Sequence, residues 1–234
     1  MLNDVEVSPY IIAISGKIGS GKNYLAEKLA QVYAAEGKTT AEISYAIALK
    51  DEASAIIEDF RTYPVDFDAL SDKYNIGITD LEQLYVFVIN DLKRKPLLTG
   101  WDRSEGIRRF LQYLGTDIRR KQNPNYWVDK IVNYIPKNVD YVFITDVRFP
   151  NEAEKALELG GFLFRLDVPE EVILSRTSTR DGMKYSAEAL NHKSEKALDD
   201  YTKFDAYVGV DFDPNSLIKN FVSFKEQDWR DHLV

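Results

Sequence analysis

The chain has no cysteine, only two histidines and no long apolar run. Without cysteine, disulfide frameworks, thiolate metal sites and cysteine nucleophiles are excluded together. With only His192 and His232, a multi-histidine metal site is not expected either. No apolar run approaches the ~20 residues of a membrane span. The first ten residues do not resemble a signal peptide, which needs a basic segment followed by an apolar one. We therefore expect a cytosolic protein that does not bind membranes.

Basic residues are also outnumbered by acidic ones. The 234 residues include 30 Lys and Arg against 38 Asp and Glu, a formal net charge of −8. This balance argues against stable binding along a nucleic-acid backbone, so a bound anion must be held by a local cluster of cations. The 44% of hydrophobic residues can fill a sizeable core. Because no repeat or linker-like segment interrupts the chain, we expect a single domain over residues 1–234.

Apolar segments typical of buried strands alternate with segments of helical periodicity. The strands are expected at Tyr10–Ser15, Thr39–Ile43, Tyr141–Asp146, Phe162–Leu166 and Ala206–Val210. The helices are expected at Gly21–Glu36, Leu49–Phe60, Tyr85–Leu92, Gly106–Leu114, Tyr126–Tyr134, Asn151–Leu159, Glu170–Thr177 and Ser216–Phe221. The rest of the segment Tyr63–Arg103 is polar and mixed, and we assign it no order. This succession predicts the α/β class with a largely parallel sheet.

The segment Gly16–Lys22 fits the pattern G-x-x-x-x-G-K. In this phosphate-binding loop, successive backbone N–H groups and a helix N-terminus surround a phosphate chain, and the lysine reaches the outer phosphates. The match directly follows an apolar strand and directly opens a helix, as the mechanism requires; the alternative is an ordinary glycine-rich turn. The predicted nucleotide-binding residues are Gly16, Lys17, Gly19, Ser20, Gly21, Lys22 and Asn23.

Asn23 stands where a serine or threonine hydroxyl normally binds Mg²⁺. An amide oxygen is a neutral substitute for that ligand. Asp146 ends an apolar strand at the carboxyl edge of the sheet, where open α/β folds bind ligands. We therefore expect Asn23 and Asp146 to hold Mg²⁺, partly through water. Arg148 lies two residues further and could bind a phosphate with its planar guanidinium. Without the glycine loop earlier in the chain, a surface turn would be the better interpretation of Asp146 and Arg148.

The segment Lys93–Lys121 contains nine basic residues and three acidic ones, which is a local excess of positive charge. Such a cluster could form a second phosphate pocket, although single members are more often solvated surface. Arg176 and Arg180 lie in a polar segment, Ser175–Leu198, that could close over transferring phosphates or merely connect a helix to a strand. In the same segment, His192 is interpreted as the start of a helix capped by Ser194. The basic residues of the cluster are Lys93, Arg94, Lys95, Arg103, Arg108, Arg109, Arg119, Arg120 and Lys121.

The chain resembles the bacteriophage-type deoxynucleoside monophosphate kinases of the P-loop kinase superfamily. The most specific part of the resemblance is the run Arg108-Arg109-x-x-Gln112-x-Leu114-Gly115-Thr116-Asp117. Tyr24, where threonine is usual, and the turn Val210–Asn215 depart from the family pattern. The other matching segments are Ser20–Asn23, Tyr126-Trp127, Asp146-Val147-Arg148 with Asn151-Glu152, Gly160-Gly161, His192-x-Ser194-Glu195 and Phe204–Val208.

The resemblance implies a three-layer P-loop kinase fold with a helical substrate-binding region at about 50–135 and a lid at about 175–198. It implies transfer of the γ-phosphoryl group of ATP to a deoxynucleoside monophosphate, with Mg²⁺, to give the diphosphate and ADP. In a phage-encoded protein this would take place in the host cytoplasm. The expected catalytic residues are Lys22, Asp146, Arg148, Arg176 and Arg180, and the expected substrate-binding residues are Arg108, Arg109, Gln112, Asp117 and Trp127.

Other functions stay open at this point. Another small-molecule P-loop kinase, for dephospho-coenzyme A or a ribonucleotide, would share the loop and the lid. A GTPase-type switch is disfavoured because no Asn-Lys-x-Asp motif occurs. A nucleic-acid-binding module would use the basic stretch Lys93–Lys121, against the acidic balance of the chain. The sequence does not select the base, the sugar or the oligomeric state, for which a homodimer is one option.

Overall fold

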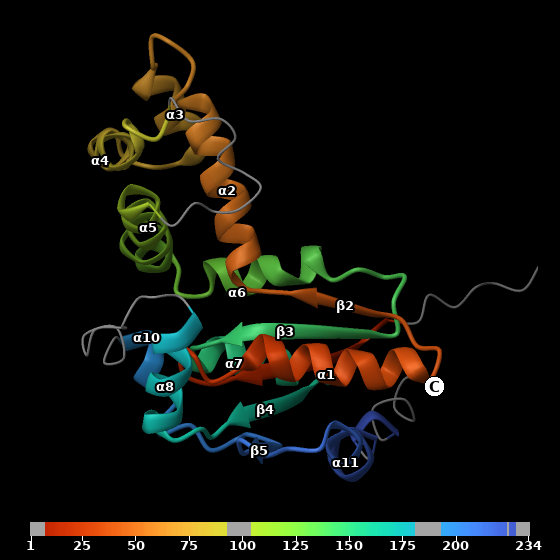
Figure 1. The fold of residues 1–234 in the computed structure, drawn as a ribbon. Coiled ribbons are helices and arrows are strands. Elements are labelled where there is room, and N and C mark those ends of the chain that lie inside the picture. Colours follow the sequence, from red (N-terminus) through yellow and green to blue (C-terminus); the bar gives the residue numbers. More distant parts are fainter. Residues whose placement is uncertain (1–7, 93–103, 181–192, 224, 228–234) are drawn as a thin grey trace, which may run out of the picture. The chain divides into compact units, whose positions relative to one another are not determined.

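In the computed structural model, residues 8–92, 104–180, 193–223 and 225–227 are described, and they belong to two compact units (Figure 1). The first unit combines the chain up to Tyr45 with the chain from Asn133 onward, and the second runs from Ala46 to Val132. Each unit has a hydrophobic core of its own. No helix in the described ranges is both long and apolar enough to cross a bilayer.

The first unit contains a five-stranded sheet in the order β2-β3-β1-β4-β5, in which every neighbouring pair is parallel. All six residues of the central strand β1 are buried, which explains its uninterrupted apolar sequence. The predicted α/β class is therefore confirmed, and the last strand ends at Val208 instead of Val210. The strands are β1 (Tyr10–Ser15), β2 (Thr40–Ile43), β3 (Tyr141–Val147), β4 (Phe162–Leu166) and β5 (Ala206–Val208).

Helices cover both faces of this sheet and form three layers with it (Figure 1). Helix α1 (Lys22–Ala35) contacts β1, β2 and β3, and α7 (Pro150–Glu158) contacts β1 and β4. Alternate residues of β1 serve the two faces, because Ile12 and Ile14 share a core with Leu25 and Leu29 of α1. The remaining helices are α8 (Glu170–Arg180), α10 (Lys193–Lys196), α11 (Pro214–Leu217) and the π-helix η3 (Ile218–Val222).

The second unit is helical wherever it has regular structure in the described ranges. Helix α4 packs on α3 and α5, and α2 contacts α5, η1 and α6. The core is formed by apolar residues of several helices, including Ile56, Leu81, Leu84, Phe110 and Leu114. The elements are α2 (Ala46–Asp59), α3 (Phe67–Tyr74), α4 (Ile78–Val88), α5 (Glu105–Gln112), the π-helix η1 (Tyr113–Arg120), α6 (Tyr126–Lys130) and the 3₁₀ turn η2 (Ile131–Tyr134), which continues into the first unit.

One helix prediction in this unit was wrong in its bounds. The helix predicted at Tyr85–Leu92 is α4, Ile78–Val88, because the buried stripe of Leu81, Leu84 and Val88 starts earlier. The helix predicted at Tyr126–Tyr134 is confirmed, with α6 up to Lys130 and the tighter 3₁₀ turn η2 from Ile131 to Tyr134. Helix α3 was not predicted at all, because Leu70 is its one buried residue and gives almost no periodic signal.

A buried ion pair joins the helices of the second unit. The Arg119 guanidinium donates to Glu52 at 2.6 Å and to the carbonyl oxygens of Tyr74, at 2.6 Å, and Asn75, at 3.2 Å. The second carboxylate oxygen of Glu52 accepts from the Tyr126 hydroxyl at 2.7 Å. The side chains of Arg119 and Glu52 are only 4% and 10% exposed. Arg119 is therefore an internal structural residue, unlike the anion-binding cation that the basic stretch suggested.

We expect Arg119→Ala to lower the free energy of unfolding by about 3–5 kcal/mol, because the buried Glu52 carboxylate loses its most buried ion-pair partner and keeps only the Lys130 ammonium and the Tyr126 hydroxyl. Urea denaturation measures the change. Arg109→Ala is the control, since Arg109 forms an exposed pair with Glu105 and its loss should cost about 0.5 kcal/mol or less. A loss below about 1 kcal/mol for Arg119→Ala would contradict this role.

Candidate active site

The loop between β1 and α1 has a backbone that requires glycine. Gly19 and Gly21 adopt left-handed conformations, with φ of 75° and 100°. A Cβ atom at Gly16 would lie 2.6 Å from the Ser20 hydroxyl and 2.9 Å from Leu166. Helix α1 begins at Lys22 without a side-chain cap, so its first turn presents backbone N–H groups at the loop. This is the geometry that binds phosphate at a helix N-terminus.

Lys22 folds back over this loop. Its ammonium group donates to the carbonyl oxygens of Gly16, at 2.7 Å, and Lys17, at 3.0 Å. Burial lowers the pKa of Lys22 to about 8; Arg148 and Arg165 lower it as well, while Glu195 and Asp146 raise it. The site therefore gathers three cations, and the charged form of Lys22 would gain from a bound anion.

The carboxyl end of β3 brings Asp146 and Arg148 to the same place. Asp146 accepts a hydrogen bond from the backbone N–H of Tyr45 at 2.7 Å. The carboxylate of Glu152, in the first turn of α7, accepts from the backbone N–H groups of Arg148, at 2.7 Å, and Phe149, at 3.1 Å. These bonds fix the turn that carries Arg148. The structure thus places three predicted catalytic residues, Lys22, Asp146 and Arg148, in one electrostatic cluster.

Asn23 has a carboxylate partner that sequence reasoning missed. The amide nitrogen of Asn23 donates to Glu42 at 3.2 Å, and the hydroxyl of Thr145 donates to the same oxygen at 2.9 Å. Glu42 lies near the end of β2, and no local motif marks it. Amide and carboxylate oxygens are the ligands that Mg²⁺ prefers. The described ranges hold no group of three or more acidic, histidine or cysteine side chains suited to a metal. An amide and a carboxylate suit a Mg²⁺ ion that keeps several waters and also binds substrate phosphates.

Two further carboxylates, one at the end of the predicted lid and one just after it, connect this part of the chain to the loop. Glu195, in α10, accepts from the backbone N–H of Ile18 at 2.6 Å and from the Arg148 guanidinium. Asp199 accepts from Arg165 at 2.9 Å and lies 3.8 Å from the Lys17 ammonium. Helices α8 and α10 lie at the end of the sheet toward which the strand arrows point (Figure 1). Sequence reasoning had assigned this segment a possible lid and a helix start, and the resemblance included Glu195, but the contacts of Glu195 and Asp199 with the loop and its arginines were not predicted.

Part of the predicted lid and of the basic stretch lies outside the described residues. This applies to residues 181–192, and so to His192, and to Lys93, Arg94, Lys95 and Arg103. Arg176 and Arg180 belong to α8, but their side chains also lie outside the described part. The catalytic role expected for these two arginines stays a prediction.

The residues expected to bind the acceptor all lie in the second unit. Arg108, Arg109 and Gln112 are exposed on α5, and Asp117 is exposed on η1. Trp127 differs from them, because it is only 2% exposed and its indole N–H donates to the carbonyl oxygen of Gly115 at 3.0 Å. Its ring packs in the interior of the unit, whereas the other four side chains are accessible.

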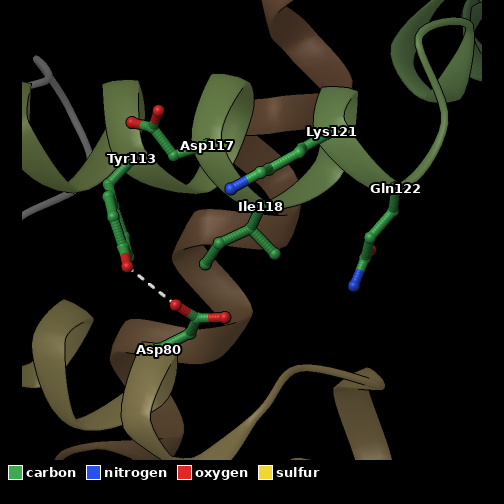
Figure 2. A pocket seen from close by; sticks show the side chains of 6 residues that line it. All are labelled: Asp80, Tyr113, Asp117, Ile118, Lys121 and Gln122. Atoms are coloured by element: carbon green, nitrogen blue, oxygen red, sulfur yellow. Dashed lines mark hydrogen bonds between the residues drawn. The ribbon is translucent and has the colours of Figure 1, made fainter.

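A polar pocket of about 350 Å³ lies between α4 and η1 (Figure 2). Within it, the Tyr113 hydroxyl donates to Asp80 at 2.7 Å. In Figure 2, Tyr113 and Asp117 lie at one end of this helical stretch and Gln122 lies at the other. Asp117 is the one predicted acceptor residue that lines this pocket. The full lining is Asp80, Tyr113, Asp117, Ile118, Lys121 and Gln122.

The sequence profile of the deoxynucleotide monophosphate kinases matches residues 68–204 of the chain. This is more than half of the chain, so the chain belongs to the deoxynucleotide monophosphate kinase family. The matched range contains the Arg108–Asp117 run, Asp146, Arg148 and Glu195, and it begins after the glycine loop. The loop is therefore assigned on its own residues and geometry.

Two viral proteins are similar to the chain. One, from Acanthamoeba polyphaga mimivirus, is named "Putative deoxynucleotide monophosphate kinase"; it is 30% identical over 109 residues, which are 37% of this chain and 54% of the relative. The other, "Uncharacterized protein ORF77" of Ictalurid herpesvirus 1 (strain Auburn), is 32% identical over 124 residues, 51% of this chain and 49% of the relative. The chain spans about half the length of these curated relatives.

Among solved structures, a gluconokinase from Sinorhizobium meliloti 1021 aligns over 94% of this chain and 93% of its own, with 15% identity and a TM-score of 0.43. The fold is defined by the five parallel strands and the helices that contact them.

The sequence analysis expects the loop to bind the phosphates of ATP, and with that expectation the lowered pKa of Lys22 predicts that ATP affinity falls as the pH rises. Above a pKa of about 8 the ammonium of the free protein loses its proton and must regain it to pair with phosphate. The dissociation constant should then increase by up to about tenfold per pH unit. Calorimetric titrations between pH 7 and 9.5 measure this change. Lys22→Arg should flatten the profile because a guanidinium stays protonated, and a flat profile for the unaltered protein would contradict the assignment.

Proposed function

We propose that this protein transfers the γ-phosphoryl group of ATP to the 5′-phosphate of a deoxynucleoside monophosphate, giving the diphosphate and ADP. The observation that carries the proposal is the cluster of Lys22, Arg148 and the glycine loop at the start of α1. Membership of the deoxynucleotide monophosphate kinase family supports the choice of acceptor.

The acceptor needs no general base. The second pKa of a phosphate monoester is about 6, so at neutral pH the attacking oxygen is already largely ionised. The loop and the end of β3 accordingly carry lysine, arginine, amide and carboxylate groups and no histidine. Catalysis then consists of aligning two anions and offsetting their repulsion.

Each residue of the cluster has a distinct part in this proposal. The backbone N–H groups of the loop and Lys22 hold the outer phosphates of ATP, as in other glycine-loop sites. Arg148 donates to the phosphoryl group in transfer, where a planar guanidinium suits phosphate oxygens. A bound Mg²⁺, held by Asn23 and Asp146 partly through water, would supply further neutralisation of the phosphate oxygens. Arg176 and Arg180 are proposed to add charge as the phosphates close together.

The acceptor is proposed to bind the second unit through its exposed polar residues, Arg108, Arg109, Gln112 and Asp117. The two guanidinium groups suit a phosphate, while the amide and the carboxylate suit the hydrogen-bonding edge of a base or sugar. Trp127 is proposed to support this surface indirectly, because its indole N–H donates to the carbonyl oxygen of Gly115 in the helix that carries Asp117.

The proposal is tested by measuring ADP formation with ATP, Mg²⁺ and each deoxynucleoside and ribonucleoside monophosphate, with dephospho-coenzyme A alongside. We expect turnover on one or more deoxynucleotides, faster than on their ribose counterparts. Lys22→Ala and Arg148→Ala should each lower kcat at least about 100-fold, because each removes a cation aimed at the transferred charge. Lys28→Ala, at a partly exposed position on α1, is the control and should leave turnover unchanged.

Turnover confined to dephospho-coenzyme A or to ribonucleotides would contradict the proposed acceptor and favour another small-molecule kinase. Near-normal rates in folded Lys22→Ala or Arg148→Ala protein would contradict the proposed roles of these residues. Circular dichroism of each variant establishes that the fold is intact.

A further inference from the structure

Glu195 makes an unusual pair of contacts. One carboxylate oxygen accepts from the backbone N–H of Ile18, the third residue of the glycine loop, and the other accepts from the Arg148 guanidinium. Its side chain is only 4% exposed, whereas that of Arg148 is 33% exposed. Taking a carboxylate out of water is costly unless hydrogen bonds replace the lost hydration. Here both replacements are groups of the nucleotide site itself.

The contact fixes an otherwise flexible side chain. An arginine side chain has many rotamers, and this freedom is lost when the side chain is held in one geometry. Glu152 holds the backbone N–H of Arg148, and Glu195 holds one terminal nitrogen of its guanidinium. Both ends of the residue are thereby fixed. Because a guanidinium has five N–H donors, a bond from one terminal nitrogen leaves capacity for phosphate oxygens.

The same carboxylate also fixes the loop. The bond from Ile18 ties the outer part of the glycine loop to α10, which is 177 residues away in sequence. Loop and arginine are therefore held by one group, and their relative position depends on the length of one side chain. Such preorganisation lowers the barrier to reaction without adding a contact to the substrate.

We propose that Glu195 is a positioning residue: its carboxylate holds the Arg148 guanidinium and the Ile18 amide in the arrangement that receives the transferring phosphoryl group. The proposal rests on the proposed function, in which Arg148 contacts that group. The opposite reading is that the carboxylate occupies the place of a phosphate and must be displaced by ATP. The two readings predict opposite effects of removing the charge.

The test compares the unaltered protein with Glu195→Gln, a nearly isosteric change that removes the charge and leaves one oxygen to accept. We expect kcat to fall about 10- to 100-fold, because a misplaced group costs up to that much, while the ATP dissociation constant changes less than about threefold. Glu158→Gln, an exposed carboxylate on α7, is the matched control and should change neither quantity. Thermal melting establishes that each variant is folded.

A double-variant cycle separates positioning from general stability. If Glu195 acts through Arg148, then Arg148→Ala with Glu195→Gln should be no more than about twofold slower than Arg148→Ala alone, since the two residues act as a unit. Glu195→Asp keeps the charge but shortens the reach, and it should lower kcat at least about fivefold. If Glu195→Gln does not fold, Glu195→Asp still tests the proposal.

Three results would overturn the proposal: a normal kcat in Glu195→Gln or Glu195→Asp, additive losses in the double variant, or ATP binding that tightens tenfold or more in Glu195→Gln without loss of kcat. The last result would identify Glu195 as a competitor of phosphate. Absence of turnover in the unaltered protein would instead count against the proposed function, so the two failures are distinguishable.

Discussion

An ammonium group buried beside two guanidinium groups is the interaction on which the first unit depends. Burial lowers the pKa of Lys22 to about 8, and Arg148 and Arg165 act in the same direction. In a chain of net charge −8, such a concentration of positive charge does not arise from composition. It is assembled by the carboxyl ends of three parallel strands, β1, β3 and β4, which deliver the loop, Arg148 and Arg165 to one edge of the sheet.

The carboxylates around this cluster offset the repulsion between its cations. Glu195 and Asp146 support the charged form of Lys22, and Asp199 pairs with Arg165. Each carboxylate also accepts a hydrogen bond from a group that shapes the site. The same carboxylates therefore balance the positive charge and fix the geometry. Arg119 in the second unit illustrates the contrast, because its buried charge is met by Glu52 and by backbone carbonyls. That arginine stabilises the unit, whereas Lys22 and Arg148 are arranged for an anion.

The parts of the structure that the sequence predicted are those with local causes. Strand β1 is an unbroken apolar run because both of its faces are buried, and the glycine loop follows because its turn requires glycine at Gly19 and Gly21. Asp146 and Arg148 could be located because they follow an apolar strand at the ligand-binding edge of the sheet.

The parts that the sequence did not predict depend on contacts between distant segments. Glu195 and Glu42 owe their roles to partners 177 and 19 residues away, and neither belongs to a motif that names such a partner. Arg119 could not be told from its exposed neighbours Arg108 and Arg109, because all three are the same residue type in one basic stretch. The π-helix η1 was not predicted either, since its wider turn changes the 3.6-residue spacing of apolar residues by which helices are predicted.

Binding of a chain of phosphates by the loop and its cations can be measured by calorimetric titration with AMP, ADP and ATP in the presence of Mg²⁺. We expect affinity to rise with each added phosphate and Lys22→Ala to remove most of this gain. Equal affinity for AMP and ATP, or a gain that survives in Lys22→Ala, would contradict this binding mode.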